Sequence, residues 1–181
     1  MGSSISNVYS YLFKYPSKKI SIIGLGGCGK TCILYRLIQN EFVSTFPTID
    51  FNFESLVYSD LEFIFFDFTS AQKMQSIIRK YFEGSNGIIF VVDGSDNERF
   101  EEFKSFFKEK MLFDEIGSCG SIMILSNKSE IDQSISVEFI KNELNLNDYG
   151  REIGVFAVSA KNNTGLWNSL DWLASKLKEN S

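Results

Sequence analysis

Residues 24–31 (GLGGCGKT) constrain this chain more than any other feature of its sequence. They fit the phosphate-loop pattern of glycine, four free positions, glycine, lysine, and serine or threonine. The apolar residues 20–23 before the loop predict a buried strand, and residues 32–38 after it predict a helix. In such a loop the backbone N–H groups surround an anion, and the helix dipole adds to the attraction. The sequence therefore predicts a nucleoside phosphate site rather than an ordinary glycine-rich turn.

The positions of this loop have separate predicted roles. Gly24 and Gly29 are expected to take backbone angles that a Cβ forbids. Lys30 is expected to lie along the β- and γ-phosphates, and the Thr31 hydroxyl to complete a Mg²⁺ shell. The predicted nucleotide-binding residues of this segment are Gly24, Leu25, Gly26, Gly27, Cys28, Gly29, Lys30, Thr31 and Cys32.

Composition excludes several other kinds of function. The chain has 181 residues, the length of one domain, and a net charge of −5, which argues against a nucleic-acid-binding surface. It has no histidine, so the usual general base is missing, and its three cysteines form no zinc-binding pattern. We interpret Cys28 as a small residue in a reducing cytosol rather than as a reactive thiol. No apolar run approaches the ~20 residues of a spanning helix.

Residues 1–16 are predicted to form a separate N-terminal amphipathic helix, followed by one domain over 17–181. The start MGSSIS fits the N-myristoylation pattern, with Gly2 as the acceptor. An acylated helix on a membrane surface needs both signals, because one myristoyl chain binds only marginally. The alternative is a terminal helix that packs on its own domain. The apolar residues at helical spacing are Ile5, Val8, Tyr9, Leu12 and Phe13.

Strand and helix patterns alternate along the rest of the chain. Residues 51–58 and 61–68 predict a β-hairpin, and the apolar run 87–93 predicts a strand buried on both faces. The alternation predicts an α/β fold: a phosphate-loop, doubly wound, mainly parallel six-stranded sheet with one antiparallel edge strand and helices on both faces. The other expected elements are helices at about 97–113, 137–146 and from 164 onward, and strands at 121–125 and 153–158.

Polar residues follow several strands at the edge where doubly wound sheets bind ligands. Asp67 is placed where a phosphate-loop protein holds Mg²⁺ through water. Alone, each of these residues would be an ordinary turn or strand-end residue, but together they predict one nucleotide pocket. The candidates after the later strands are Asn127, Lys128 and Glu130, and then Ser159, Ala160 and Lys161.

The order of these motifs resembles a Ras-like small GTPase, and more narrowly the ADP-ribosylation factor (Arf) family, over essentially the whole chain. The resemblance implies binding of GTP or GDP with Mg²⁺. Thr48 would contact the metal only when the γ-phosphate is present, which makes its loop switch one, and the loop after Asp67 becomes switch two. The resemblance rests on Gly2 with its amphipathic segment, GLGGCGKT, Pro47-Thr48-Ile49, Phe51-Asn52-Phe53-Glu54, Tyr81-Phe82, residues 87–93 and Asn127-Lys128.

The resemblance also implies partners and a location. The implied partners are effector proteins, an exchange factor, a GTPase-activating protein and a membrane surface. The protein is expected to be a monomer that is cytoplasmic and, in the GTP form, peripheral on endomembranes such as the Golgi. The strand pair between the switches is expected to slide on GTP loading and expel the N-terminal helix. Phe51, Phe66 and Tyr81 match the family's effector patch, although such aromatics are also common in cores.

In the family pattern, the metal-facing aspartate is followed by one free position, two glycines and a glutamine. Switch two of this chain departs from that pattern. Ser70 replaces the glycine whose N–H meets the γ-phosphate, and Ala71 falls on the water-orienting glutamine. A methyl group cannot position water, so we expect very slow hydrolysis. Gln72, the one candidate catalytic residue, lies one position too late.

Two further departures concern the base site and switch one. Glu130 stands where the family has the base-reading aspartate, and its carboxylate still suits the two N–H donors of guanine better than adenine. Asp50 stands where the family has a glycine. Three readings remain: a guanine-nucleotide switch in membrane traffic, a pseudo-GTPase that acts as a scaffold, and a phosphate-loop kinase or ATPase. The third is disfavoured because Asn127-Lys128 would have no role and no lid segment is visible.

Overall fold

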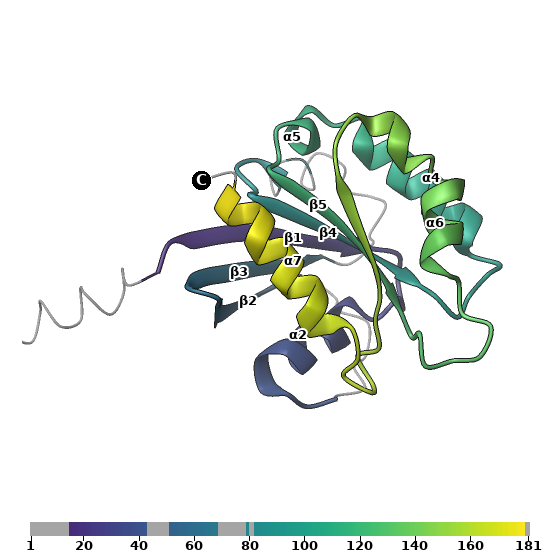
Figure 1. The fold of residues 1–181 in the computed structure, drawn as a ribbon, viewed down its shortest axis with the longest axis horizontal. Helices are drawn as coiled ribbons and strands as arrows, with labels where there is room; N and C mark the ends of the chain where they lie inside the picture. The colour runs from purple at the N-terminus through teal and green to yellow at the C-terminus, as the bar shows by residue number, and fades with distance from the viewer. Residues whose placement is uncertain (1–14, 43–50, 69–78, 80–81, 180–181) are drawn as a thin grey trace, which may run out of the picture.

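The computed structural model describes residues 15–42, 51–68, 79 and 82–179, with the side chains of 51–53, 67 and 68 excepted. Its sheet has six strands in the order β2-β3-β1-β4-β5-β6. Only the β2–β3 pair is antiparallel; every other neighbouring pair is parallel (Figure 1). This is the mainly parallel sheet with one antiparallel edge strand that the sequence predicts, so the predicted fold class is confirmed. The strands are β1 (Ser17–Gly24), β2 (Phe51–Tyr58), β3 (Leu61–Phe68), β4 (Gly87–Asp93), β5 (Ser121–Asn127) and β6 (Ile153–Ala157).

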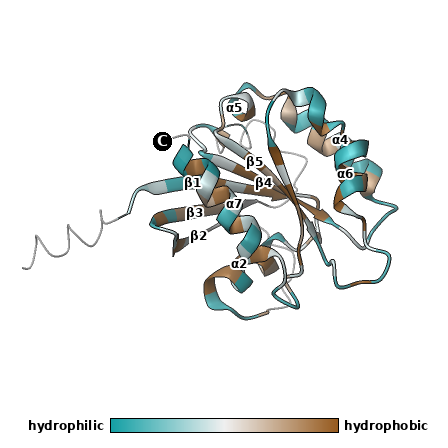
Figure 2. Ribbon diagram, viewed as in Figure 1, coloured by the Kyte–Doolittle hydropathy of each residue, from teal (hydrophilic) through white to brown (hydrophobic). Residues whose placement is uncertain are grey.

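Helices cover both faces of the sheet. On one face α2 and α7 pack against the sheet, and on the other face α4, α5 and α6 do so (Figure 1). The side chains of β4 alternate between the two layers: Phe90 packs against α4, and Val91 lies with the residues of α2 and α7. Apolar colour accordingly gathers in the strands and on the inner sides of the helices (Figure 2). The helices are α2 (Lys30–Gln39), α4 (Phe100–Met111), α5 (Asp114–Gly117), α6 (Val137–Glu143), the 3₁₀ helix η1 (Leu146–Tyr149) and α7 (Leu166–Glu179).

Several boundaries differ from the expected ones. The helix expected over 97–113 is shorter and covers Phe100–Met111 (α4). The backbone at Phe113 is extended (φ −79°, ψ 131°), and a separate short helix that the sequence did not predict, α5, starts at Asp114. The helix expected over 137–146 ends at Glu143, where Asn145 is left-handed at φ 52° and a 3₁₀ turn follows. Thr164 makes a backbone bridge with Ser159, so α7 begins after Gly165 instead of at a Thr164 cap. Within the described ranges, no helix is long and apolar enough to span a bilayer.

Candidate functional site

The phosphate loop joins β1 to α2, and its backbone requires glycine at two positions. A Cβ on Gly24 would lie 2.2 Å from the carbonyl oxygen of Val91 on the neighbouring strand. Gly29 has φ 93°, and a Cβ there would lie 2.3 Å from Nδ2 of Asn127. Both distances are shorter than any real contact of a Cβ. The loop therefore packs directly on β4 and β5, and this close packing is the reason that both positions require glycine.

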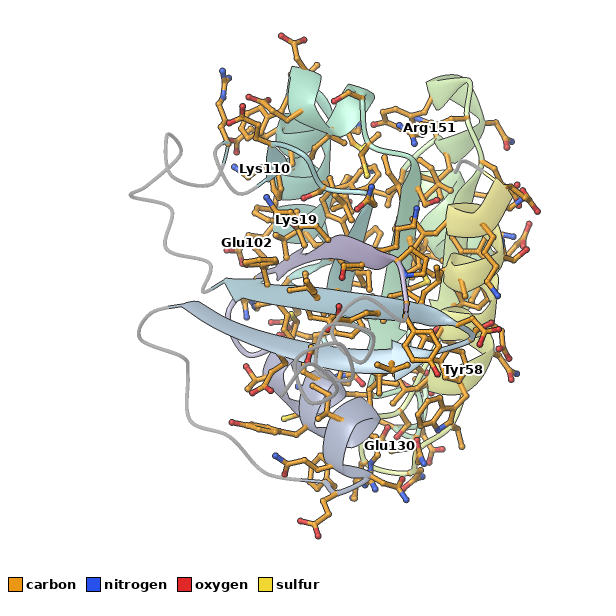
Figure 3. All side chains as sticks on the ribbon, turned by 90° about the vertical axis from the view of Figure 1, so that its left-hand side faces the viewer. Lys19, Tyr58, Glu102, Lys110, Glu130 and Arg151 are labelled. Atoms are coloured by element: carbon orange, nitrogen blue, oxygen red, sulfur yellow. The ribbon has the colours of Figure 1, made fainter. Side chains whose placement is uncertain are left out.

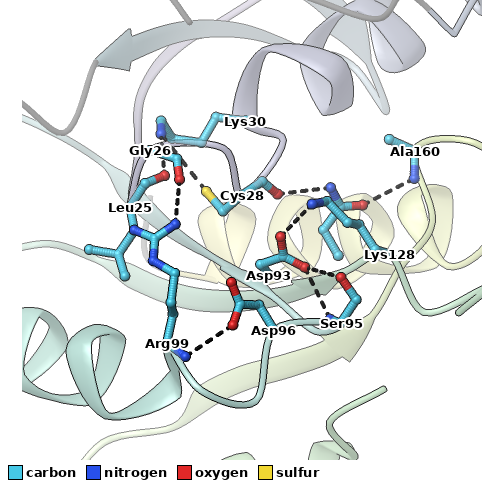
Figure 4. Close-up of polar contacts among 11 residues, drawn as sticks. Leu25, Gly26, Cys28, Lys30, Asp93, Ser95, Asp96, Arg99, Lys128 and Ala160 are labelled. Carbon is cyan, nitrogen blue, oxygen red and sulfur yellow. Dashed lines mark hydrogen bonds and ion pairs between the residues drawn. The ribbon is translucent and has the colours of Figure 1, made fainter. Parts of the chain in front are cut away.

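Lys30 is the first residue of α2, and its side chain folds back over the loop. Its Nζ donates to the carbonyl oxygens of Gly24 (3.0 Å) and Leu25 (3.1 Å), and Figure 4 shows the second of these hydrogen bonds. Only 7% of the residue is exposed. A buried ammonium group is costly unless it is hydrogen-bonded, so these two carbonyls offset its desolvation. The positive charge is thus fixed at the inner side of the loop, where an anion would enter.

Arg99 supports the loop from the other side. Its Nη1 donates to the carbonyl oxygen of Gly26 (2.9 Å), and its backbone N–H donates to Asp96 (3.1 Å) (Figure 4). Its Nε pairs with Glu102 at 2.9 Å, and this hydrogen bond raises the pKa of the guanidinium. A cavity of about 10 Å³, with Arg99 and Cys28 in its wall, lies beneath the loop. Sequence reasoning missed Arg99, because nothing local to it indicates a partner 73 residues away.

Cys28 lies at the base of the loop and is 1% exposed. Its side chain packs with the apolar layer of α2 and α7, and its Sγ lies 3.8 Å from Nζ of Lys30. A small buried side chain is what the sequence interpretation expects at this position.

Asn127 connects the phosphate loop to the loop after β6. Its Nδ2 donates to the carbonyl oxygen of Cys28 (3.0 Å), and its Oδ1 accepts from the N–H of Ala160 (3.2 Å). The residue is 2% exposed, so both groups of the amide are used inside the protein. The side chain that the sequence assigns to the nucleotide site thus ties its two halves together.

Lys128 follows in a left-handed conformation (φ 66°) and forms an ion pair with Asp93 at the end of β4. Asp93 also accepts hydrogen bonds from the N–H and the hydroxyl of Ser95, at 3.0 and 2.6 Å. These contacts fix the end of β4 beside the end of β5 (Figure 4).

Glu130 has an unusual environment for a carboxylate. Its Oε2 is buried and, among the residues that the structure describes, it has no hydrogen-bond partner. A buried polar atom without a partner is costly, and each such atom in a native fold calls for an explanation. An oxygen that can accept two more hydrogen bonds is suited to a ligand edge that carries N–H donors.

The loop after β6, residues 159–163, completes this side of the site. Its Ser159 bridges to Thr164 through two backbone hydrogen bonds (2.9 and 3.2 Å), and the Ser159 hydroxyl accepts from the N–H of Asn162 at 2.9 Å. The loop is thus a closed turn whose backbone N–H of Ala160 faces Asn127. The residues predicted after β5 and after β6 therefore lie together, as expected from their positions at the carboxyl ends of adjacent strands.

The residues present at the phosphate end fit a magnesium nucleotide. The Thr31 hydroxyl is at the start of α2, and the register of β3 places Asp67 beside Ile22, two residues before the loop begins. Hydroxyl and carboxylate oxygens are ligands that Mg²⁺ prefers, and it is usually held together with phosphate oxygens and water. The backbone of the loop would supply the place for those phosphates.

Phe66 of the predicted effector patch is half-buried and has the ammonium group of Lys19 over its ring, at 5.4 Å from the centroid. Burial lowers the pKa of Lys19. The predicted residues that lie outside the described residues or side chains are Gly2, Thr48, Asp50, Phe51, the Asp67 carboxylate, Ser70, Ala71, Gln72 and Tyr81.

Three comparisons with known proteins agree. The model of the ADP-ribosylation factor family matches residues 5–177. ADP-ribosylation factors K and J of Dictyostelium discoideum are each 34% identical to this chain over 178 residues, which cover 98% of this chain and 94% of each relative. The structure of the Arl6 BBS3 small GTPase from Trypanosoma brucei with the bound nucleotide analogue GppNp has a TM-score of 0.80 and 22% identity, and covers 91% of this chain and 99% of that chain. This last likeness concerns the fold.

Proposed function

The chain belongs to the ADP-ribosylation factor family of small GTPases, and from this premise we propose that it is a switch that binds GDP or GTP with Mg²⁺. The observation that carries the proposal is the Asn127 amide, which joins the phosphate loop to the loop after β6 at 3.0 and 3.2 Å. One buried side chain thereby sets the distance between a phosphate cradle and a base site. A nucleotide is the ligand that needs both. Residues 24–32 hold the phosphates, Lys128, Glu130 and residues 159–161 hold the base, and Asn127 joins the two parts.

Glu130 gives this site its preference for guanine. Guanine presents two N–H donors on one edge, and the buried Oε2 of Glu130 lacks a partner among the described residues. Adenine presents an acceptor at the corresponding place, which would repel the carboxylate. A site built to accept hydrogen bonds rejects an analogue that cannot donate them, because its own polar atoms then stay unpaired.

We expect Glu130→Gln to weaken the binding of GDP by about 100-fold, because the amide presents N–H groups to the donors of guanine. Its binding of ADP should not weaken and should tighten, since the amide removes the repulsion between the carboxylate and the acceptor of adenine and can donate to that acceptor. Competition of GDP and ADP against a fluorescent GDP analogue measures both constants. Glu138→Gln, an exposed glutamate on α6, is the matched control and should change neither. Equal loss for both nucleotides would exclude Glu130 as the base-selecting residue.

The proposed switch hydrolyses GTP slowly. Ala71 stands at the position of the glutamine that orients the attacking water, and its methyl group makes no hydrogen bond. Phosphoryl transfer depends on the position of the nucleophile, so loss of that contact leaves only the electrostatics of the loop and the metal. Gln72 is the nearest residue with the right chemistry, one position further along the chain.

Ala71→Gln is expected to raise the single-turnover rate of GTP hydrolysis by about tenfold or more, since it returns a water-positioning amide to the loop. Ala71→Asn is the matched control: its amide is one methylene shorter and should leave the rate nearly unchanged. The rate is followed as phosphate released from preloaded protein. A starting protein as fast as Ala71→Gln would contradict the assignment of slow hydrolysis.

The β2–β3 hairpin is the element that we propose to move between the two states. It lies between the two predicted switch loops, and its turn is fastened to α7 at the other end (Figure 3). The Tyr58 hydroxyl donates to Asp171 (2.5 Å), which raises the pKa of Tyr58, and Lys178 donates to Ser59 (3.0 Å). A hairpin that slides along β1 must exchange these contacts, so a change at the switches would be felt at α7 and beside the entry of the chain at Pro16.

The N-terminal segment supplies the proposed membrane contact. Gly2 lies in a myristoylation pattern and an apolar stripe follows it, so acyl chain and helix together would hold the GTP form on an endomembrane surface during traffic. Effectors would bind at the patch of Phe51, Phe66 and Tyr81. Mass spectrometry of the mature N-terminus tests the acylation, and a free Gly2 in the protein isolated from its own cells would contradict it.

The competing reading is a pseudo-GTPase that acts as a scaffold. The substitution at Ala71 favours it, because a protein without hydrolysis cannot complete a cycle unaided. The two readings differ in the response to an activating protein: a switch hydrolyses GTP when that partner completes the site, whereas a scaffold keeps the same partners with either nucleotide or with none.

A further inference from the structure

Arg36 of α2 contacts the same loop, residues 159–163, that we assign to the base. Its Nε donates to the carbonyl oxygen of Ala160 (2.7 Å), and its Nη2 donates to that of Lys161 (2.9 Å). Its Nη1 donates to the carbonyl oxygen of Asn40 at the end of α2 (2.9 Å). One guanidinium therefore fixes two consecutive peptide groups of the loop, and a planar fork does this with little loss of freedom.

The loop is held on both sides. On the side of the sheet, Asn127 accepts a hydrogen bond from the N–H of Ala160. On the side of α2, Arg36 donates to the carbonyl oxygen of Ala160. Next to Arg36, Asn163 donates from its Nδ2 to Oδ1 of Asn40 (3.1 Å). Because carbonyls that point toward Arg36 turn the following N–H groups the other way, the guanidinium sets the direction of the loop's donors.

We propose that Arg36 is a positioning residue of the base site: it holds the carbonyl oxygen of Ala160 so that the backbone N–H of Lys161, on the opposite side of the same peptide group, faces the 6-carbonyl of a bound guanine. This inference rests on the proposed function. Glu130 accepts from the N–H edge of the base, and the carbonyl beside that edge then needs donors, which a tight loop supplies. Since α2 begins at Lys30 and ends at Gln39, one rigid helix links the phosphate end to the base end. Arg36 thus lengthens nucleotide residence without touching the ligand.

Arg36→Gln is expected to speed the release of GDP about tenfold, by loss of two charge-assisted hydrogen bonds to the loop. Arg36→Lys keeps one donor to the loop, so its rate of GDP release should lie between those of the starting protein and Arg36→Gln. Release is followed by chasing a fluorescent GDP analogue with excess GDP.

The sharper readout uses ligands altered at single atoms of the base. Inosine diphosphate keeps the 6-carbonyl, so its release should also be about tenfold faster from Arg36→Gln. In 6-thioguanosine diphosphate a poor acceptor replaces the carbonyl oxygen, so the effect of Arg36→Gln should shrink to about twofold or less. A helix that merely frays at its end would change the release of all three ligands alike.

Arg151 is the matched control. It also donates to three carbonyl oxygens, those of Ile116 (3.2 Å), Gly117 (3.4 Å) and Cys119 (2.5 Å), but at the end of the molecule opposite Glu130 (Figure 3). Arg151→Gln should lower the melting temperature as much as Arg36→Gln and leave GDP release within twofold.

Two results would overturn the assignment: unchanged GDP release in Arg36→Gln, or an equal acceleration for GDP, inosine diphosphate and 6-thioguanosine diphosphate. Both leave the proposed function standing, because the starting protein still binds GDP. Failure of the starting protein to bind GDP is the separate result that removes the proposed function.

Discussion

Lys30→Ala is expected to lower the affinity for GDP and GTP by about 100-fold or more, because it removes a cation that lies over the inner side of the phosphate loop. In the structure Nζ is held there by the carbonyl oxygens of Gly24 and Leu25, so its position is fixed before any ligand arrives. A preorganised charge binds phosphate more strongly than a mobile one, since no ordering cost is left. Equilibrium titration with fluorescent GDP in the presence of Mg²⁺ measures the change.

A second buried lysine provides the control for this prediction. Lys110, on α4, is 4% exposed and pairs with Glu109 at 2.9 Å. Its ammonium group lies over the rings of Phe106 and Phe113. Lys110→Ala removes a buried ammonium group from the protein without touching the loop. It should lower the melting temperature at least as much as Lys30→Ala and keep GDP affinity within about twofold. Comparable loss of affinity in both variants would show that Lys30 acts through stability alone.

Gly29→Ala is expected to destabilise the fold by about 3 kcal/mol and to abolish nucleotide binding. The left-handed φ of 93° is unfavourable for alanine, and its Cβ would lie 2.3 Å from the amide nitrogen of Asn127. To make room, Asn127 must leave either Cys28 or Ala160, which separates the phosphate loop from the base loop. Denaturant unfolding and GDP titration report the two effects separately.

Gly150→Ala isolates the backbone cost. Gly150 has φ 64°, and no atom lies within 4 Å of the place of its Cβ. The substitution should therefore cost about 1 kcal/mol for the left-handed conformation, with GDP affinity unchanged. If Gly29→Ala proved no worse than Gly150→Ala in either measurement, the contact between Asn127 and the loop would have no role in the site.

The β2–β3 hairpin is an element whose boundaries can be predicted from the local sequence alone. Residues 51–58 and 61–68 match β2 and β3 to the residue, since alternating side chains end at Ser59-Asp60 and both turn residues have positive φ. The break between α4 and α5 cannot be predicted from the local sequence. Apolar spacing continues through Phe113 and Ile116, neither glycine nor proline marks the break, and packing in the core decides it.

The candidate site divides in the same way. The phosphate loop, Asn127 and the loop after β6 follow from spacing and from the rule that ligands bind at the carboxyl ends of strands. The roles of Arg99 and Arg36 could not be predicted in this way. Gly26, the partner of Arg99, lies 73 residues away in the chain, and Ala160, the partner of Arg36, lies 124 residues away. An arginine that binds backbone carbonyls leaves no residue pattern in its partner, so only the fold reveals it.

The most direct measurement is calorimetric titration of the purified chain with GDP and with ADP, each with Mg²⁺ and again after its removal by EDTA. We expect tight binding of GDP that weakens when Mg²⁺ is removed, and binding of ADP weaker by about 100-fold or more. Absence of heat with GDP in the presence of Mg²⁺, or equal affinity for the two nucleotides, would contradict this expectation.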